Sequence, residues 1–119
     1  MDMKSYKELI VWQKSVEFCT FIYKTTETFP KFELYGLTSQ IRRSAVSIPS
    51  NIAEGHSRGH KGYIQFLKIA FGSGAELETQ LRIALQIKFL NTDNFEELNS
   101  KLEEIMKMLN KLISSLNSD

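Results

Sequence analysis

The sequence has little of what would make it a secreted or membrane-bound protein. It holds a single cysteine, Cys19, so no disulfide can close within the chain. The first residues lack the apolar centre of a signal peptide, and no apolar run approaches the roughly 18 residues that a membrane span needs. These absences predict a cytoplasmic protein without a membrane partner.

Alternation of apolar and polar residues, the mark of a half-buried strand, is also missing, whereas spacings of three and four residues recur throughout. The 119 residues, 42% of them hydrophobic and 24% charged, have the composition of one globular domain. We predict an all-α fold, with helices over about residues 8–28, 35–54, 61–89 and 94–118. Because the connections are short, neighbouring helices should be antiparallel, which gives an up-down-up-down four-helix bundle.

The first predicted helix carries two rows of apolar residues. The row with regular core spacing is Leu9, Trp12, Val16, Cys19 and Tyr23. Beside it lies a second row of Val11, Phe18 and Ile22, which one partner helix would not cover. We therefore expect Val11, Phe18 and Ile22 to form a contact between the subunits of a homo-oligomer.

The second and third helices contain residues that are unusual inside helices. Glycines at positions 72 and 74 lie near the centre of the third helix, where they lower helix propensity unless a neighbouring backbone comes close. We expect Gly72 or Gly74 to face the second helix. Ser47, Ser50 and Asn51 are predicted to hydrogen-bond across to the third helix, where Ser73 and Gln80 are available.

The residues that could support catalysis or metal binding are poorly placed. His56 and His60 are four residues apart but lie on a turn broken by glycines, without a third ligand. Cys19 lies in an apolar row, which is typical of an inert thiol. Glu76 and Glu78 point in different directions on a helix. The sequence thus predicts a protein that is not an enzyme and has no catalytic, metal or cofactor site.

The net charge of +1 conceals an uneven distribution along the chain. Residues 1–35 are neutral and residues 76–119 carry a net charge of −3, while residues 36–75 carry +4. The basic residues of this middle segment are Arg42, Arg43, Arg58, Lys61 and Lys68, against Glu54 alone. A basic segment favours an anionic partner, and a solvated face balanced by an acidic neighbouring helix is the alternative.

One stretch resembles a known family. Residues 47–55 read Ser-Ile-Pro-Ser-Asn-Ile-Ala-Glu-Gly, nine successive matches around a mid-helix proline, and residues 9–14, Phe29-Pro30 and Gly72-Ser73 match as well. The chain resembles the bacterial four-helix-bundle proteins encoded in intervening sequences of 23S ribosomal RNA genes, whose relatives include the accessory protein of diversity-generating retroelements. The resemblance implies a ring, pentameric in characterised relatives, with a basic surface proposed to bind nucleic acid.

Two functions follow from these observations. The first is an oligomer that binds the backbone of RNA or DNA, with Arg43, Arg58 and Lys61 as leading contacts and Arg42 and Lys68 as secondary ones. The second is an oligomeric adaptor or scaffold whose basic side docks an acidic protein.

A structural ion pair is the competing interpretation for each arginine taken alone. In particular, Arg42 points away from the other basic residues and is expected to pair with an acidic residue of the third or fourth helix. Stacking of bases on aromatic rings would favour single strands, and only Tyr63 lies close to the basic residues in the sequence.

Overall fold

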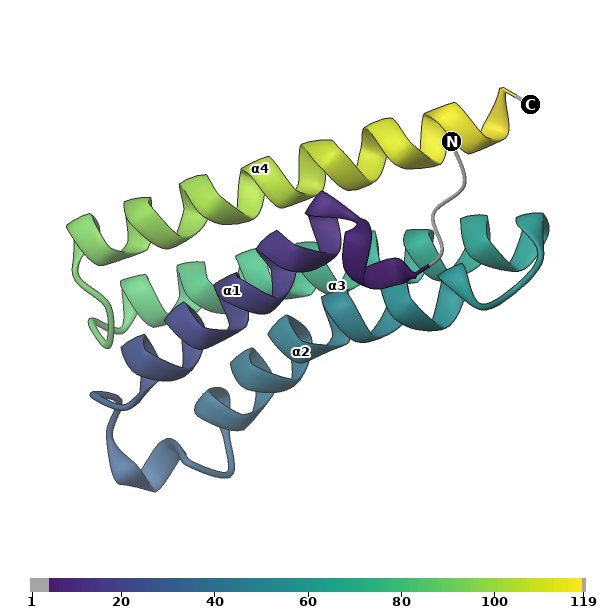
Figure 1. The fold of residues 1–119 in the computed structure, drawn as a ribbon. Helices are drawn as coiled ribbons and strands as arrows, with labels where there is room; N and C mark the ends of the chain where they lie inside the picture. Colours follow the sequence, from purple (N-terminus) through teal and green to yellow (C-terminus); the bar gives the residue numbers. More distant parts are fainter. Residues whose placement is uncertain (1–4, 119) are drawn as a thin grey trace.

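Four long helices run alternately up and down in the structure, a computed structural model that describes residues 5–118 (Figure 1). The elements in chain order are η1 (Tyr6–Glu8), α1 (Ile10–Thr26), η2 (Lys31–Glu33), α2 (Leu37–His56), α3 (His60–Gln86) and α4 (Thr92–Asn117), the two η elements being single 3-10 turns. No strand occurs within the described residues. The predicted all-α four-helix bundle is confirmed, and each helix begins and ends within three residues of its predicted boundary.

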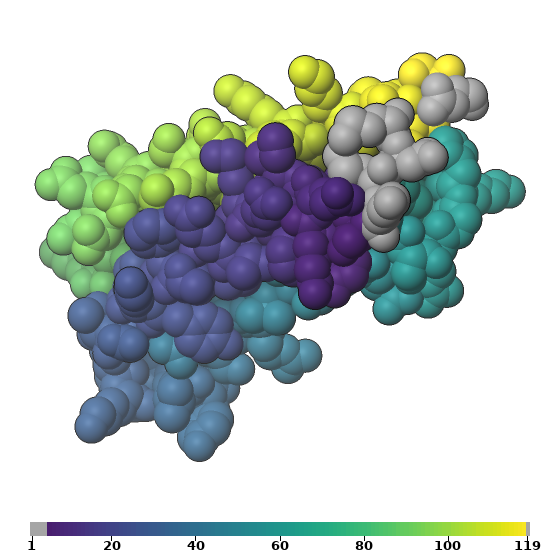
Figure 2. Space-filling model, in the orientation of Figure 1, coloured from purple at the N-terminus to yellow at the C-terminus, as the bar shows by residue number. Residues whose placement is uncertain are grey.

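The bundle is elongated, with principal extents of 45 × 23 × 20 Å. The η2 segment and the turn between α2 and α3 lie at opposite ends of the long axis, where Figure 2 shows them in blue and teal. Residues near the start of α2 and residues near its end are therefore far apart on the surface.

The core is built from aliphatic side chains contributed by all four helices. Its largest fully buried members are Ile22, Ile41, Ile48, Ile52, Leu67, Leu77, Leu81, Leu102, Ile105 and Leu109. Burying one such side chain contributes about 1.5 to 3 kcal/mol relative to leaving it exposed. In α2, α3 and α4 the buried face is the face that the three-and-four spacing predicts.

Helix α1 is rotated relative to the prediction. Val11, Phe18 and Ile22 are 4%, 2% and 0% exposed and belong to the core of the single chain, so they cannot form a contact between subunits. The buried face of α1 is hard to recognise in the sequence because two polar residues, Ser15 and Thr26, interrupt its apolar spacing. Both hydroxyls donate to carbonyls one turn back, Ser15 to Val11 at 2.6 Å and Thr26 to Ile22 at 2.8 Å, which lets them be buried.

The expected polar link between α2 and α3 is present only in part, because Ser50 is exposed and Asn51 bonds within its own helix. The hydroxyls of Ser47 and Ser73 are 2.8 Å apart, and Asn51 donates to the carbonyl and hydroxyl oxygens of Ser47 within α2. Helix α2 continues through Pro49, which is buried. The contact between Ser47 and Ser73 fixes the register of α2 against α3.

The glycines lie differently from the prediction. A side chain at Gly74 would meet Met106 of α4, whereas no atom lies within 4 Å of the position that a Cβ would take at Gly72, so neither glycine faces α2 closely. The close approach of α2 to α3 occurs instead at Gly55. A Cβ there would lie 2.7 Å from Cβ of Phe66 and 3.3 Å from the ring of Tyr63.

Replacing the two glycines separately tests where the backbones meet. Gly55→Ala should lower the free energy of unfolding by about 1 to 2 kcal/mol, because the added methyl group must push α3 away. Gly72→Ala makes the same chemical change in open space and should raise the stability by about 0.5 to 1 kcal/mol. Urea denaturation followed by circular dichroism measures both. A Gly55→Ala variant as stable as the parent would contradict the packing described here.

Candidate nucleic-acid interface

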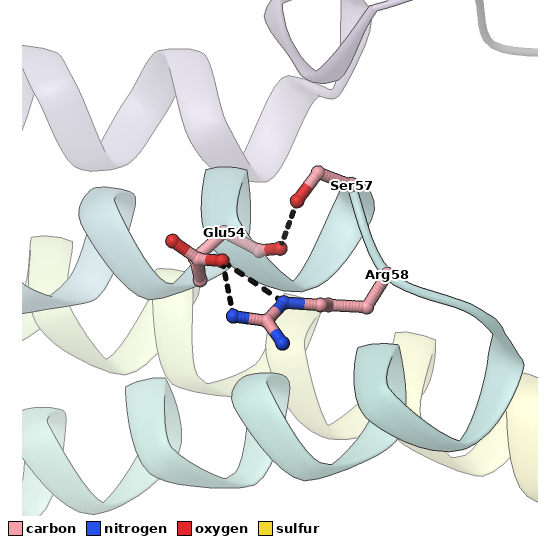
Figure 3. Close-up of polar contacts among 3 residues, drawn as sticks. All are labelled: Glu54, Ser57 and Arg58. Carbon is pink, nitrogen blue, oxygen red and sulfur yellow. Dashed lines mark hydrogen bonds and ion pairs between the residues drawn. The ribbon is translucent and has the colours of Figure 1, made fainter.

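The turn between α2 and α3 gathers polar and basic groups at one end of the bundle. The hydroxyl of Ser57 donates to the carbonyl of Glu54 at 2.7 Å (Figure 3). The backbone N–H of Arg58 donates to the carbonyl of Gly55 at 2.9 Å. These bonds satisfy the last carbonyls of α2. The chain then reverses at Gly59 and enters α3 at once.

Arg58 is oriented by two neighbours. Its Nε and Nη2 atoms donate to one carboxylate oxygen of Glu54 at 2.9 and 2.7 Å, and its guanidinium lies 5.0 Å from the ring centroid of Phe66. Both charged side chains are about half exposed, at 53% and 47%. An exposed pair of this spacing is worth only about 0.3 to 0.5 kcal/mol, so a phosphate can compete for the arginine. In Figure 3 the remaining guanidinium nitrogen points away from Glu54.

The beginning of α3 lies directly beside Arg58. Gly59 caps this helix without a side-chain hydrogen bond, and the first turn holds no acidic residue. The exposed side chain of Lys61 lies in that turn. Unpaired backbone N–H groups and the helix dipole favour an anion at such an end. Arg58 and Lys61 are therefore the two predicted contacts that the structure brings together.

Arg42 has a structural role instead of the expected pairing with an acidic residue of α3 or α4. Its Nε atom donates to the hydroxyl of Thr26 at 2.9 Å and Nη2 donates to the carbonyl of Tyr23 at 3.5 Å. The guanidinium also lies 4.6 Å from the ring centroid of Tyr23. A cation at the C-terminal turn of α1 interacts favourably with the helix dipole. This contact could not be seen in the sequence, because it depends on how α1 and α2 pack.

Arg43 and Lys68 are exposed but lie away from the turn. Arg43 is about 20 Å along α2 from His56, since each helical residue advances the chain by about 1.5 Å. Lys68 lies two turns into α3, on the same helix as Lys61. Neither Arg43 nor Lys68 forms an ion pair within residues 5–118.

The aromatic residues near these cations also differ from the prediction. Tyr63 is half-buried against His56, with ring centroids 5.6 Å apart, and burial raises its pKa above the ordinary value. Its ring is therefore partly covered, which leaves less surface for stacking. The most exposed aromatic rings of the described residues are those of Phe32 and Tyr35, at 80% and 94% exposure, in the segment before α2. In the sequence, neither ring belongs to the three-and-four spacing of apolar residues, and this alone could have indicated that both are exposed.

Other reactive groups are few in the described part of the chain. Burial raises the pKa of Cys19 to about 11, and its thiol donates to the carbonyl of Ala45, so it is protonated near neutral pH. No three His, Cys, Asp or Glu side chains of residues 5–118 come together as metal ligands would. None of the helices in this range combines the length and hydropathy needed to cross a bilayer.

The neighbouring arginines of α2 should respond differently to truncation. Arg42→Ala should lower the free energy of unfolding by about 1 to 2 kcal/mol, because it removes a charged hydrogen bond to Thr26 and the cation at the end of α1. Arg43→Ala should change it by less than about 0.5 kcal/mol. Thermal or urea unfolding measures both, and equal effects would contradict the structural role of Arg42.

Comparison with known proteins agrees with this architecture. A protein of unknown function from the S23 ribosomal protein family of Bacteroides thetaiotaomicron has a similar structure, with a TM-score of 0.79 and 29% sequence identity. The similarity covers 87% of this chain and 98% of that one. No curated protein matches. Residues 7–111 match the sequence profile of the 23S rRNA-intervening sequence proteins, and the chain belongs to that family.

Proposed function

We propose that this protein is a non-enzymatic nucleic-acid-binding protein that holds the phosphate backbone at the α2–α3 end of the bundle. Arg58, Lys61 and the start of α3 form the principal contact, Lys68 extends it along α3, and Arg43 is a separate contact near the start of α2. The observation that carries the proposal is a helix N-terminus whose first turn holds no acidic residue and which is flanked by Lys61 and by Arg58, the latter in an exposed pair with Glu54.

The distribution of charge supports a binding role over a merely solvated face. Lys61 and Lys68 are the charged residues of the first half of α3, and no acidic residue accompanies them before Glu76. Neither lysine is committed to an ion pair among the described residues. Acidic residues gather on α4 instead, which holds five of them against three lysines. The basic end is thus separated from the acidic helix, and its cations remain available to an anion.

The family description associates its members with an intervening sequence of 23S rRNA. RNA is for this reason the first strand to test, although phosphate contacts alone would hold DNA as well. The alternative, an adaptor that docks an acidic protein, would use the same cations.

We also propose that the protein is a homo-oligomer, and a pentamer if the resemblance extends to assembly. The contact cannot use Val11, Phe18 or Ile22, which are buried. Exposed apolar side chains elsewhere on the bundle are available, among them Val16, Tyr23, Val46, Ile69, Ile83 and Ile87. Such an assembly would repeat the basic end in every subunit and increase the local positive charge.

Light scattering of the protein in dilute solution tests the assembly. The expected mass is a multiple of the 13.7 kDa chain that does not change over a tenfold dilution. A monodisperse species at the mass of one chain would contradict it.

Binding to a short single-stranded RNA should depend steeply on salt. If about five phosphates are neutralised, log affinity should fall against log salt with a slope near −3.5, roughly a hundredfold loss between about 50 and 200 mM. Arg58→Glu with Lys61→Glu should weaken binding to every strand and make the slope shallower by roughly one to two. Fluorescence anisotropy over a salt series measures both quantities.

The matched control is Lys107→Glu with Lys111→Glu, which makes the same change of charge on exposed positions of α4. This control should affect binding much less, because α4 lies outside the proposed contact. Equal losses in the two double variants would show that only net charge matters and would contradict the assigned surface. If the parent binds neither RNA nor DNA at low salt, the adaptor becomes the better hypothesis.

A further inference from the structure

A polar hollow of about 310 Å³ lies between the beginning of α2 and the middle of α3, at the end of the bundle opposite the α2–α3 turn. Tyr35, Gln40 and Arg43 line it from the α2 side, and Glu76 and Gln80 line it from α3. Its volume is at the lower end of the range typical of small-ligand sites. The phosphate-binding end proposed above does not include it.

Residues of opposite charge line this hollow without forming an ion pair. Arg43 and Glu76 are both exposed, and neither takes part in an ion pair within the described residues. The space between them suits a ligand that offers acceptors on one side and donors on the other. A simple anion or cation would use only one of the two groups.

A buried acceptor in the wall of the hollow is also unused. The side-chain oxygen Oε1 of Gln80 is inaccessible to solvent and accepts no hydrogen bond from residues 5–118. A buried polar atom without a partner costs free energy, so such atoms usually have a partner in the functional state. A ligand in the hollow would reach this atom only after rotation of the Gln80 side chain, which lines the hollow.

An exposed ring stands beside these polar groups. Tyr35 is 94% exposed, although a tyrosine side chain normally buries much of its ring. Exposed aromatic faces next to cations are the platforms on which proteins stack unpaired bases. The hollow thus combines a stacking surface with hydrogen-bonding groups of both kinds.

We propose that this hollow binds an unpaired guanine base within a single strand. The base would stack on Tyr35, its N1–H and N2–H groups would donate to the carboxylate of Glu76, and O6 or N7 would accept from Arg43. Guanine presents two adjacent donors on its Watson–Crick edge, which adenine, cytosine and uracil do not. The inference rests on the proposed binding of nucleic acid and adds a base preference to it.

Two oligouridines that differ at one position test the preference directly. Each is roughly 12 nucleotides long, within the range that single-strand-binding proteins cover, and carries either guanine or adenine at the centre. Fluorescence anisotropy at about 150 mM salt should give about tenfold tighter binding to the guanine strand. Hypoxanthine in place of guanine removes the N2 amino group and should reduce that preference.

Glu76→Gln separates base recognition from electrostatics. The change removes a negative charge, so electrostatics alone predicts tighter binding to every strand, whereas loss of the paired acceptor predicts loss of the guanine preference. Glu78→Gln is the matched control, because Glu78 lies on the same helix but lines a different hollow, toward α4. It should keep the preference in full.

Tyr35→Ala should weaken binding to the guanine strand about tenfold, whereas Phe32→Ala, which removes another exposed ring of the same segment, should have little effect. Equal affinity of the parent for the two strands would overturn the base site while leaving the phosphate contact intact. Loss of the preference in Glu78→Gln would overturn it too. Absence of binding to both strands even at low salt would overturn the base site together with the proposed function.

Discussion

The close approach of α2 to α3 fixes the surface on which the functional proposals depend. Gly55 allows the backbones to meet near the turn, and the hydroxyls of Ser47 and Ser73 join the helices farther along at 2.8 Å. Because these contacts set both the distance and the register, they hold the turn with Arg58 against Phe66 of α3 at one end. They also place Arg43 and Glu76 around one hollow at the other. Packing therefore explains residues 47–55, the stretch that matches the family. Beyond it, Lys61 forms no ion pair among the described residues, and Arg58 is half exposed in its pair with Glu54.

Some arginines are used to satisfy the unpaired carbonyl groups at helix ends, and only the others remain available for a ligand. Arg42 and Arg43 are adjacent in the sequence, yet α1 uses Arg42 to complete its last turn, and Arg43 faces solvent. At the α2–α3 turn, Glu54 orients Arg58 without burying it. A basic segment in a sequence thus overstates the number of phosphate contacts, because part of its charge stabilises the fold.

Much of the fold could be predicted from the sequence, and the exceptions have physical causes. The regular apolar spacing in α2, α3 and α4 predicts their buried faces, as Ile41, Leu81 and Leu102 show. The face of α1 could not be predicted, because Ser15 and Thr26 satisfy their hydroxyls within their own helix and are buried like apolar residues. For the candidate site, the sequence identifies the cations but not their partners. It also favours Tyr63, which packing buries, over Tyr35, which lies outside the helices.

The central claim is that the two ends of the α2–α3 pair, and not α4, meet a nucleic-acid strand. Titration of the isotopically labelled protein with a short guanine-containing RNA, followed through backbone amide chemical shifts, tests it most directly. The account predicts shifts of the amides of Arg58, Lys61 and Gly62 at one end and of Tyr35 and Arg43 at the other, with α4 unchanged. Shifts centred on α4, or none at low salt, would contradict it.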